Sequence, residues 1–357
     1  MKKEKVNIIR ARGLLFIIPL AFFVFFSSCR SSYYEITIEV QEPASITLPI
    51  DVTELLIVNN AIEQPNDVGI VRTYKESTVD GYPISFDSIS WTVAISSMSY
   101  IKDAEFFDEV FLFNESVRTD NDWMVGIPLT EEFRNEIFNT QGFDGIVSID
   151  RILFKLDEHV NPSALTDFID MKAEGQVTCS IYLYAKEKPL TTFSISDSLF
   201  YKRTVNVDME TVFKEIPENF LFNLAYNMGE KLAHNITPSW TTATRIVYVG
   251  MEARMQEAYN YSKNNNWATA ESIWLKEYNK KSKDSDKGKL ANNIALANEM
   301  QDKLEEALFW AEKAKEHFLN SNSSKNSYIN NYIPELQKRI QNSQMLNFQL
   351  LGIDESN

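Results

Sequence analysis

The hydrophobic pattern of this chain changes at Met251, and that change limits the folds open to it. Before Met251, apolar runs and alternating segments typical of β-strands are interleaved with helical periodicity. After it, apolar residues recur at helical spacing only. The charge differs as well, since 29–250 carries 34 acidic and 16 basic residues whereas 251–342 carries 13 and 14. The 357 residues therefore predict two differently built domains.

The domain predicted over 51–250 has the pattern of a mixed sheet with helices. Its run Glu54–Asn60 is apolar almost throughout, which favours a strand buried on both faces. Further strands are predicted over 106–113, 145–156, 176–185, 190–195, 198–207 and 245–249. Helices are predicted over 85–101, 130–139 and 212–235. This order predicts an α+β fold, in which a mixed α/β sheet domain precedes an all-α helical domain.

The domain predicted over 251–342 contains an internal repeat. Ala258 and Ala270 are matched by Ala295 and Ala307, and the two units are offset by 37 positions. The stretch Leu304–Ala314 resembles the second helix of a tetratricopeptide (TPR) repeat. The first unit departs from that pattern, because Glu277 stands where a small residue is expected. Since stacked repeats need about three units for stability, we expect a capping helix over 329–340 or packing against the first domain.

The resemblance to tetratricopeptide repeats implies a groove, because in that family the concave face holds peptides. The residues of the first helices that would line it are Met255, Gln256, Tyr259, Asn292, Asn293 and Leu296. These six are the predicted partner-binding residues. The lysine-rich clamp that binds a C-terminal carboxylate in that family is not evident here, which argues against a partner of the chaperone type.

The first 29 residues have the pattern of an export signal. A basic tip is followed by the apolar run Leu14–Phe26, then by Ser27, Ser28 and Cys29. The small pair before a cysteine resembles the lipobox of bacterial lipoproteins, which implies removal of 1–28 and lipidation of Cys29. A plain signal peptide with an incidental cysteine, or an N-terminal anchor helix, are the alternatives. Residues 29–50 are predicted to form a tether, in which the alternation of Tyr33–Val40 favours an edge strand or an extended leader. Residues 343–357 are predicted to form a tail.

The chain as a whole resembles the Bacteroides-type lipoproteins of unknown function that join an α/β domain to tetratricopeptide repeats. Besides the lipobox and the second repeat, Pro238-Ser239-Trp240 followed by Arg245-xx-Tyr248 looks like the junction in that family. The resemblance implies a protein of the cell envelope, anchored at the outer membrane. Because Arg30-Ser31-Ser32 lacks the acidic run that marks export to the surface in related bacteria, we expect it to face the periplasm.

Few residues carry a recognisable chemistry. No glycine motif for phosphates, no HExxH and no Gly-x-Ser-x-Gly occurs, and the three histidines stand apart in the sequence. Cys179 lies in an alternating segment and is expected to be a small buried residue. The acidic clusters lack the spacing of a calcium loop, and the acidic first domain argues against nucleic acid. We therefore expect no metal, no cofactor and no catalysis.

Two classes of function are consistent with these patterns. The first is a non-enzymatic envelope lipoprotein that acts as a protein–protein binding or assembly module through its TPR-like repeats. The alternative is a glycan-binding or hydrolytic lipoprotein that acts through the acidic α/β domain. That alternative predicts a deep pocket lined by convergent acids and by Trp123, which lies in a polar loop over 121–126. A purely structural spacer would have neither groove nor pocket.

Overall fold

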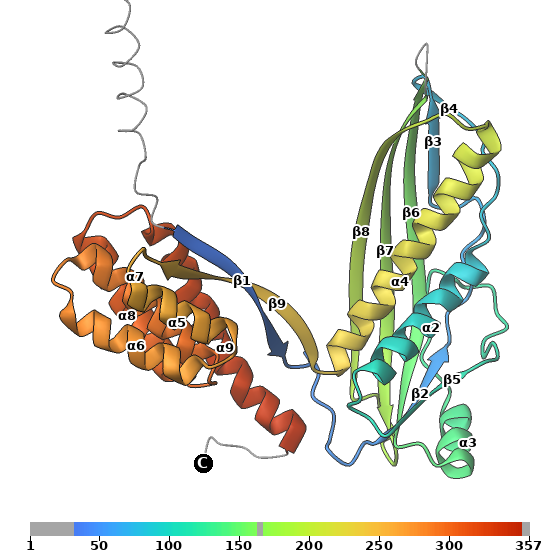
Figure 1. Cartoon of the computed structure of the whole chain (residues 1–357). Coiled ribbons are helices and arrows are strands. Elements are labelled where there is room, and N and C mark those ends of the chain that lie inside the picture. The colour runs from blue at the N-terminus through green and yellow to red at the C-terminus, as the bar shows by residue number, and fades with distance from the viewer. Residues whose placement is uncertain (1–31, 163–166, 352–357) are drawn as a thin grey trace, which may run out of the picture. The chain divides into compact units, whose positions relative to one another are not determined.

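The structure is a computed structural model, and it describes residues 32–162 and 167–351. The predicted signal segment and Cys29 lie outside these residues. The α+β prediction is confirmed, because a sheet-containing part is followed by a run of helices (Figure 1). Two compact units result. The sheet unit comprises Val40–Thr241 and the described residues from Asn342 on, and the helical unit comprises the described residues up to Glu39 and Thr242–Gln341.

The sheet unit is built around one long strand, β6 (Gly145–Pro162). Its first residues pair in parallel with β2 (Glu54–Asn59), and its later ones pair in parallel with β3 (Ile70–Tyr74). On its other side β6 pairs with β7 in antiparallel fashion. The remaining strands are β4 (Ser77–Thr78), β5 (Glu109–Phe113), β7 (Asp167–Leu183) and β8 (Thr191–Val205). The strands predicted over 176–185, 190–195 and 198–207 are present, the last two as the single strand β8, and β6, β7 and β8 pair in antiparallel order.

The apolar run of β2 is buried on both faces, as expected. Leu55 and Ile57 pack with α2 (Phe86–Asp103) and α4 (Ile216–Ile236), which lie side by side on one face of the sheet (Figure 1). Leu56 and Val58 pack on the opposite face with α3 (Glu131–Gln141). A short π-helix, η1 (Thr211–Glu215), precedes α4, so the helix predicted over 212–235 begins with a widened turn.

The sequence did not predict strands β3 and β4. The side chain of Gln64 explains how β3 is positioned along β6. The amide of Gln64 accepts a hydrogen bond from the backbone N of Phe154 at 2.9 Å and donates to its carbonyl oxygen at 2.9 Å. This amide bridges the gap between the end of β2 and the start of β3 along β6. Gly69 follows in the left-handed region (φ +80°), where a Cβ would lie 2.5 Å from the oxygen of Phe154.

Among the described residues of the sheet unit, no helix packs on the second face of one part of the sheet. Beyond the register shift between Ile149 and Arg151, the face of β6, β7 and β8 opposite to α2 and α4 carries mostly polar side chains. Leu153, Lys155, Glu174 and Gln176 are all at least partly exposed there. This open face follows from the alternation of the strands, because every second residue belongs to the core on the other side.

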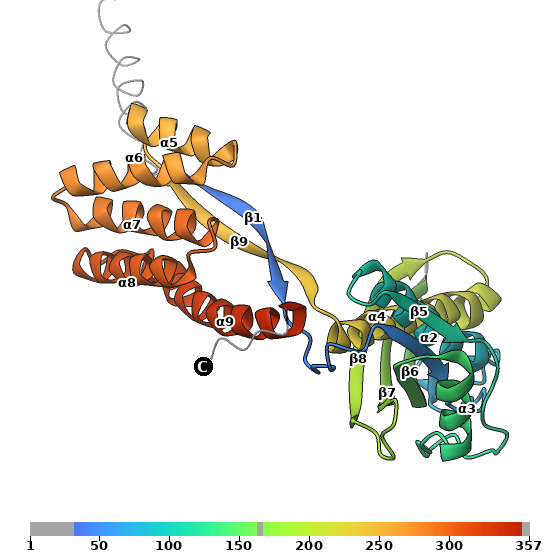
Figure 2. The ribbon, with the colours of Figure 1, turned by 90° about the horizontal axis from the view of Figure 1, so that it is seen from below.

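The helical unit contains two helical hairpins and part of a last helix. Its helices are α5 (Ala253–Lys263), α6 (Trp267–Lys280), α7 (Asp284–Glu299), α8 (Leu304–Asn320) and the first part of α9 (Asn326–Leu351). Figure 2 shows them stacked in chain order. The predicted capping helix over 329–340 lies within α9, but α9 continues to Leu351 and so includes residues 343–351 of the predicted tail.

Strands β1 (Ser32–Glu42) and β9 (Ser239–Val249) pair to form a two-stranded ribbon, and parts of both strands belong to the helical unit. The two arrows run in opposite directions in Figure 1. Residues predicted to form a tether over 29–50 thus include a paired strand, and β9 is longer than the strand predicted over 245–249. None of the helices within the described ranges is long and apolar enough to cross a membrane.

Candidate binding groove of the helical unit

The repeat predicted from the alanine spacing is visible in the packing of α5–α8. The small residues at the helix crossings are all fully buried: Ala258, Ala270, Ala295 and Ala307. Their lack of a larger side chain lets the helices approach closely. The turns repeat as well, since Asn265 (φ 57°) and Asp302 (φ 58°) take the same left-handed conformation 37 positions apart. Asparagine and aspartate tolerate this conformation better than most residues.

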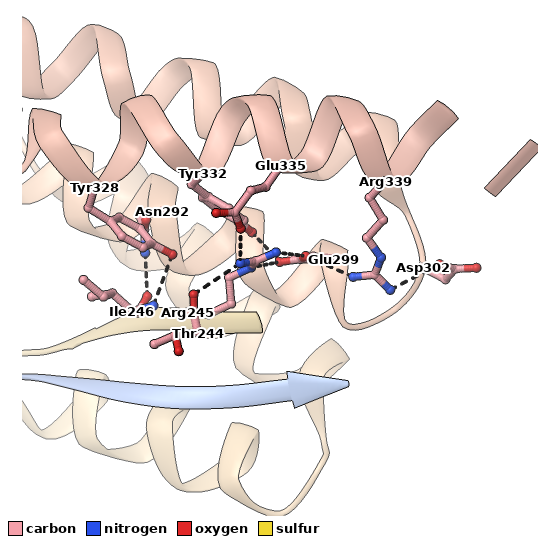
Figure 3. Close-up of polar contacts among 10 residues, drawn as sticks. All are labelled: Thr244, Arg245, Ile246, Asn292, Glu299, Asp302, Tyr328, Tyr332, Glu335 and Arg339. Carbon is pink, nitrogen blue, oxygen red and sulfur yellow. Dashed lines mark hydrogen bonds and ion pairs between the residues drawn. The ribbon is translucent and has the colours of Figure 1, made fainter. Parts of the chain in front are cut away.

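Two neighbouring asparagines of α7 bind the backbone of β9. The Oδ1 atom of Asn293 accepts from the backbone N of Tyr248 at 2.8 Å, and its Nδ2 donates to the Tyr248 oxygen at 2.7 Å. Asn292 donates to the oxygen of Ile246 at 2.8 Å, and the N of Ile246 donates to the hydroxyl of Tyr328 at 3.2 Å (Figure 3). Both asparagines are fully buried. Side chains therefore pair with this edge of β9 as a further strand would.

The side chains at the end of β9, Val247–Val249, are buried among the helices on both sides of the strand. Val247 and Val249 belong to an apolar cluster that includes Trp274, and Tyr248 packs against Phe318 with ring centroids 6.0 Å apart. We call the surface of α5, α7 and α9 that contacts the ribbon the repeat groove. Within the helical unit, this groove holds an extended segment of the same chain.

A buried ion-pair network fastens the middle of β9. Arg245 donates from Nε and from a terminal nitrogen to the two oxygens of Glu299, both at 2.9 Å. It also donates to Glu335 at 2.6 Å. Glu299 accepts two more hydrogen bonds, from the Tyr332 hydroxyl at 2.8 Å and from Arg339 at 3.0 Å (Figure 3). With four donors around one carboxylate, the charge of the fully buried Glu299 is matched by hydrogen bonds.

The surroundings of Arg245, Tyr328 and Tyr332 raise the pKa of all three side chains. Burial by itself lowers the pKa of Arg245, but the hydrogen bonds and the charge of Glu299 outweigh it and raise that pKa. Burial, followed by the charge of Glu299, raises the pKa of Tyr332. Burial also raises the pKa of Tyr328 to about 12. Both tyrosines therefore stay neutral and can donate or accept as the network requires.

The six predicted partner-binding residues lie together around the ribbon. Met255 and Leu296 are buried in the apolar cluster with Val247, and Asn292 and Asn293 bind β9 as described above. Gln256 donates to the oxygen of Gly250 at 2.7 Å. Tyr259 stacks on Tyr34 of β1, with centroids 4.9 Å apart and planes inclined by 6°. The structure thus places an extended segment at the predicted positions, and that segment belongs to the chain itself.

Sequence reasoning missed the charged part of the groove. Arg245 belongs only to the junction pattern with Tyr248, and Glu299 belongs to no predicted motif. A signal existed for both, because each is a lone charge in a stretch that is otherwise apolar or small: Ile246-Val247 follows Arg245, and Ala295 and Ala297 precede Glu299. An isolated charge at a core position predicts a buried partner, although the sequence does not say which one.

Other predicted residues lie in the sheet unit. Cys179 is fully buried as expected, and burial together with the nearby charge of Asp150 raises the pKa of its thiol, so it is not an activated nucleophile. Among the residues that the structure describes, no three or more His, Cys, Asp or Glu side chains are grouped to hold a metal ion. Trp123 lies at the edge of a trough on the open face of the sheet.

Comparison with known families places both parts of the chain. The model described as "Domain of unknown function (DUF8603)" matches residues 52–248, which is more than half of the chain. The chain belongs to the DUF8603 family. Its match begins just before β2 and ends within β9. A second model, "Domain of unknown function (DUF6340)", matches residues 256–338, from α5 into α9. No curated protein matches this DUF8603 member.

Two solved structures are similar to the DUF8603 member over part of its length. The PelC dodecamer from Paraburkholderia phytofirmans has 9% identity and a TM-score of 0.23, covering 57% of this chain and 99% of that chain. A protein named as a neuraminyllactose-binding hemagglutinin homolog from Helicobacter pylori has 10% identity and a TM-score of 0.27, covering 54% and 89%. At these TM-scores neither likeness carries an argument about function.

Proposed function

We propose that this chain is a non-enzymatic, lipid-anchored protein of the cell envelope that acts as a protein-binding and assembly module through its helical repeats. The observation that supports it most is the paired contact of Asn293 with both backbone groups of Tyr248. Backbone recognition of this kind lets a groove bind an extended segment irrespective of its side chains. The repeats therefore have the chemistry of a strand-binding groove.

In the structure, the repeat groove binds the β1–β9 ribbon of the same chain. Because the ribbon fills it, an external strand cannot occupy Asn292 and Asn293 at the same time. Of the six predicted residues, solvent reaches Gln256 and part of Tyr259. Beside them lies an exposed aromatic surface of β1, since Tyr33 is 52% and Tyr34 is 49% exposed and Tyr34 stacks on Tyr259. Part-exposed tyrosines are enriched at protein interfaces. We propose that the envelope partner contacts these three tyrosines.

The membrane anchor is the other half of this proposal. Cys29, outside the described residues, is followed after only two residues by Ser32, where β1 begins. If Cys29 is lipidated as the sequence resemblance implies, β1 links the anchor to the repeats with little free chain between them. Such a link suits a module that acts close to a membrane, and we place it at the outer membrane, facing the periplasm.

A crosslinked pulldown from intact envelopes tests the proposal. We expect the full chain to capture an envelope protein, and Tyr259→Ala to lose it because the stacked tyrosine pair is broken. Tyr261→Ala is the matched control, since Tyr261 lies on the same helix and is 37% exposed without a ring contact to β1. Cys29→Ala should release the protein from the membrane pellet. Equal capture by both tyrosine variants would place recognition elsewhere.

A further inference from the structure

The open face of the sheet unit carries a trough of about 830 Å³. It crosses the strands at one level, and its floor is formed by Leu153, Lys155, Glu174, Gln176, Ser196 and Ser198. The segment Val68–Val71 closes one end, and Lys231 of α4 lies at the other, beyond the edge strand β8. A volume of this size is in the range of small-molecule sites, roughly 300–1,000 Å³.

The aromatic rim of the trough is held in place before any ligand arrives. Trp123 and Met124 line the trough from a loop that is wrapped around the side chain of Arg118. That guanidinium binds Asp120 through two hydrogen bonds of 2.9 and 2.6 Å, and donates to the backbone oxygens of Asp122 and Val125. A second arginine, Arg151 of β6, donates to the oxygen of Met124 at 3.1 Å. The loop is therefore tied both to itself and to the sheet, so ordering it costs little on binding.

The floor offers polar groups that no described residue uses. The hydroxyls of Ser196 and Ser198 and the indole N–H of Trp123 have no hydrogen-bond partner among the described residues. Gln176 accepts from Arg151 at 3.2 Å, which leaves its NH₂ group free to donate. Hydroxyls can both donate and accept, so this set of groups matches a ligand that itself carries several hydroxyls.

The charges of the trough are balanced, although the sheet unit is strongly acidic. Lys155 and Lys231 stand against Glu174 and Asp197. Asp197 accepts from Lys231 at 2.6 Å and from the backbone N of Ser198 at 2.9 Å, so its carboxylate is already engaged. A site with no net charge gives no advantage to an anion or a cation. Because its carboxylate is already hydrogen-bonded, Asp197 is also unsuited to be the second carboxylate of a glycosidase pair.

We propose that this trough binds a neutral saccharide, with the ring of Trp123 packed against the apolar face of a sugar and the serines and Gln176 bonded to its hydroxyls. The site goes beyond the binding-module function, since it uses other residues and another unit of the chain. It does not require hydrolysis. An indole has the combination that this role needs, a broad apolar surface with one donor at its edge.

The test is a binding measurement on the full mature chain with soluble neutral oligosaccharides, namely hexamers of glucose, mannose and N-acetylglucosamine, and with hexagalacturonate as the anionic probe. Isothermal titration should show binding of at least one neutral hexamer in preference to hexagalacturonate. Trp123→Ala and the double variant S196A/S198A should each weaken it about tenfold or more. Trp240→Ala is the matched control, because Trp240 is 66% exposed in the same unit and lies outside the trough.

Several results would overturn the proposal. Failure of every neutral hexamer to bind at millimolar concentration is one, and preference for hexagalacturonate is another. Equal affinities of Trp123→Ala and Trp240→Ala would place binding at a different surface. Unchanged melting temperatures of the variants, measured first, ensure that a loss of affinity reports on the site and not on the fold. Binding of unstructured peptide in place of saccharide would also refute it.

Discussion

Replacement of Glu299 by leucine probes the ion-pair network that fastens β9. In the native chain Glu299 accepts four hydrogen bonds, two of them from Arg245, which is itself 3% exposed. Glu299→Leu leaves Arg245 with a single carboxylate partner, Glu335, and leaves the buried Tyr332 hydroxyl without its acceptor. Removing one partner of a buried pair costs about 3–5 kcal/mol. We expect the helical unit to lose that much unfolding free energy.

Two further variants make the measurement decisive. Glu335 contacts the same arginine at 2.6 Å, but its side chain is 53% exposed, so Glu335→Leu should cost less than about 1 kcal/mol. The double variant R245M/E299L replaces the pair with apolar side chains and should recover most of the loss of Glu299→Leu. Because Trp91, Trp123 and Trp240 lie in the sheet unit, they are replaced by phenylalanine in every variant, so that guanidinium denaturation followed by the fluorescence of Trp267, Trp274 and Trp310 reports on the helical unit. A cost for Glu299→Leu no larger than that for Glu335→Leu would refute the reasoning.

Three other predictions follow from single contacts. Asn293→Ala leaves the buried N–H and C=O of Tyr248 without partners and should cost about 2–6 kcal/mol in a urea denaturation, at roughly 1–3 kcal/mol per group; a cost below 1 kcal/mol would mean that water or another group replaces the amide. Burial raises the pKa of Glu158 from 4.5 to about 7 against the opposing effect of Arg72. The stability contributed by the protonated Glu158 is thus complete below pH 4.5 and is lost as the pH rises through 7, by about 3 kcal/mol. Glu158→Gln should flatten this dependence of the unfolding free energy on pH, and an unchanged dependence would contradict the assignment to Glu158. Gly69→Ala forces a left-handed alanine against the oxygen of Phe154 and should lower the melting temperature of the sheet unit, whereas Gly142→Ala, with the same φ of +80° but open space around its Cβ, should lower it less.

The parts of the fold that could be predicted are those with a local period. The apolar run of β2 predicted burial on both faces, because no polar residue interrupts Leu55–Val58. The burial of Ala258 and Ala295 could also be predicted from a local pattern, because the spacing of small residues is the same in both repeat units. In contrast, β3 depends on the Gln64 amide, which bonds to Phe154, 90 residues away in the chain. Such a contact leaves no local periodicity to detect.

The residues that surround the repeat groove could be predicted from the sequence, but the segment that fills it could not. Its six residues were found from the repeat pattern, and all of them lie around the ribbon. That the occupant would be β9 could not be predicted, because Asn293 and Tyr248 are 45 residues apart and asparagine is mostly found exposed. Trp123 was recognised as a loop aromatic near a possible ligand, but the ordering of its loop by Arg118 depends on backbone oxygens and has no sequence signature.

Hydrogen exchange of individual backbone amides in the full chain tests the central claim most directly, namely that the repeat groove is filled by β9. Because the Tyr248 amide donates to a buried side chain, it should exchange as slowly as the core amides of α7, and the Ile246 amide should also be protected. Asn293→Ala should accelerate exchange at Tyr248 while α7 stays protected. Rapid exchange at both β9 amides in the unmodified chain, with α7 protected, would show that the groove is open and would contradict the account.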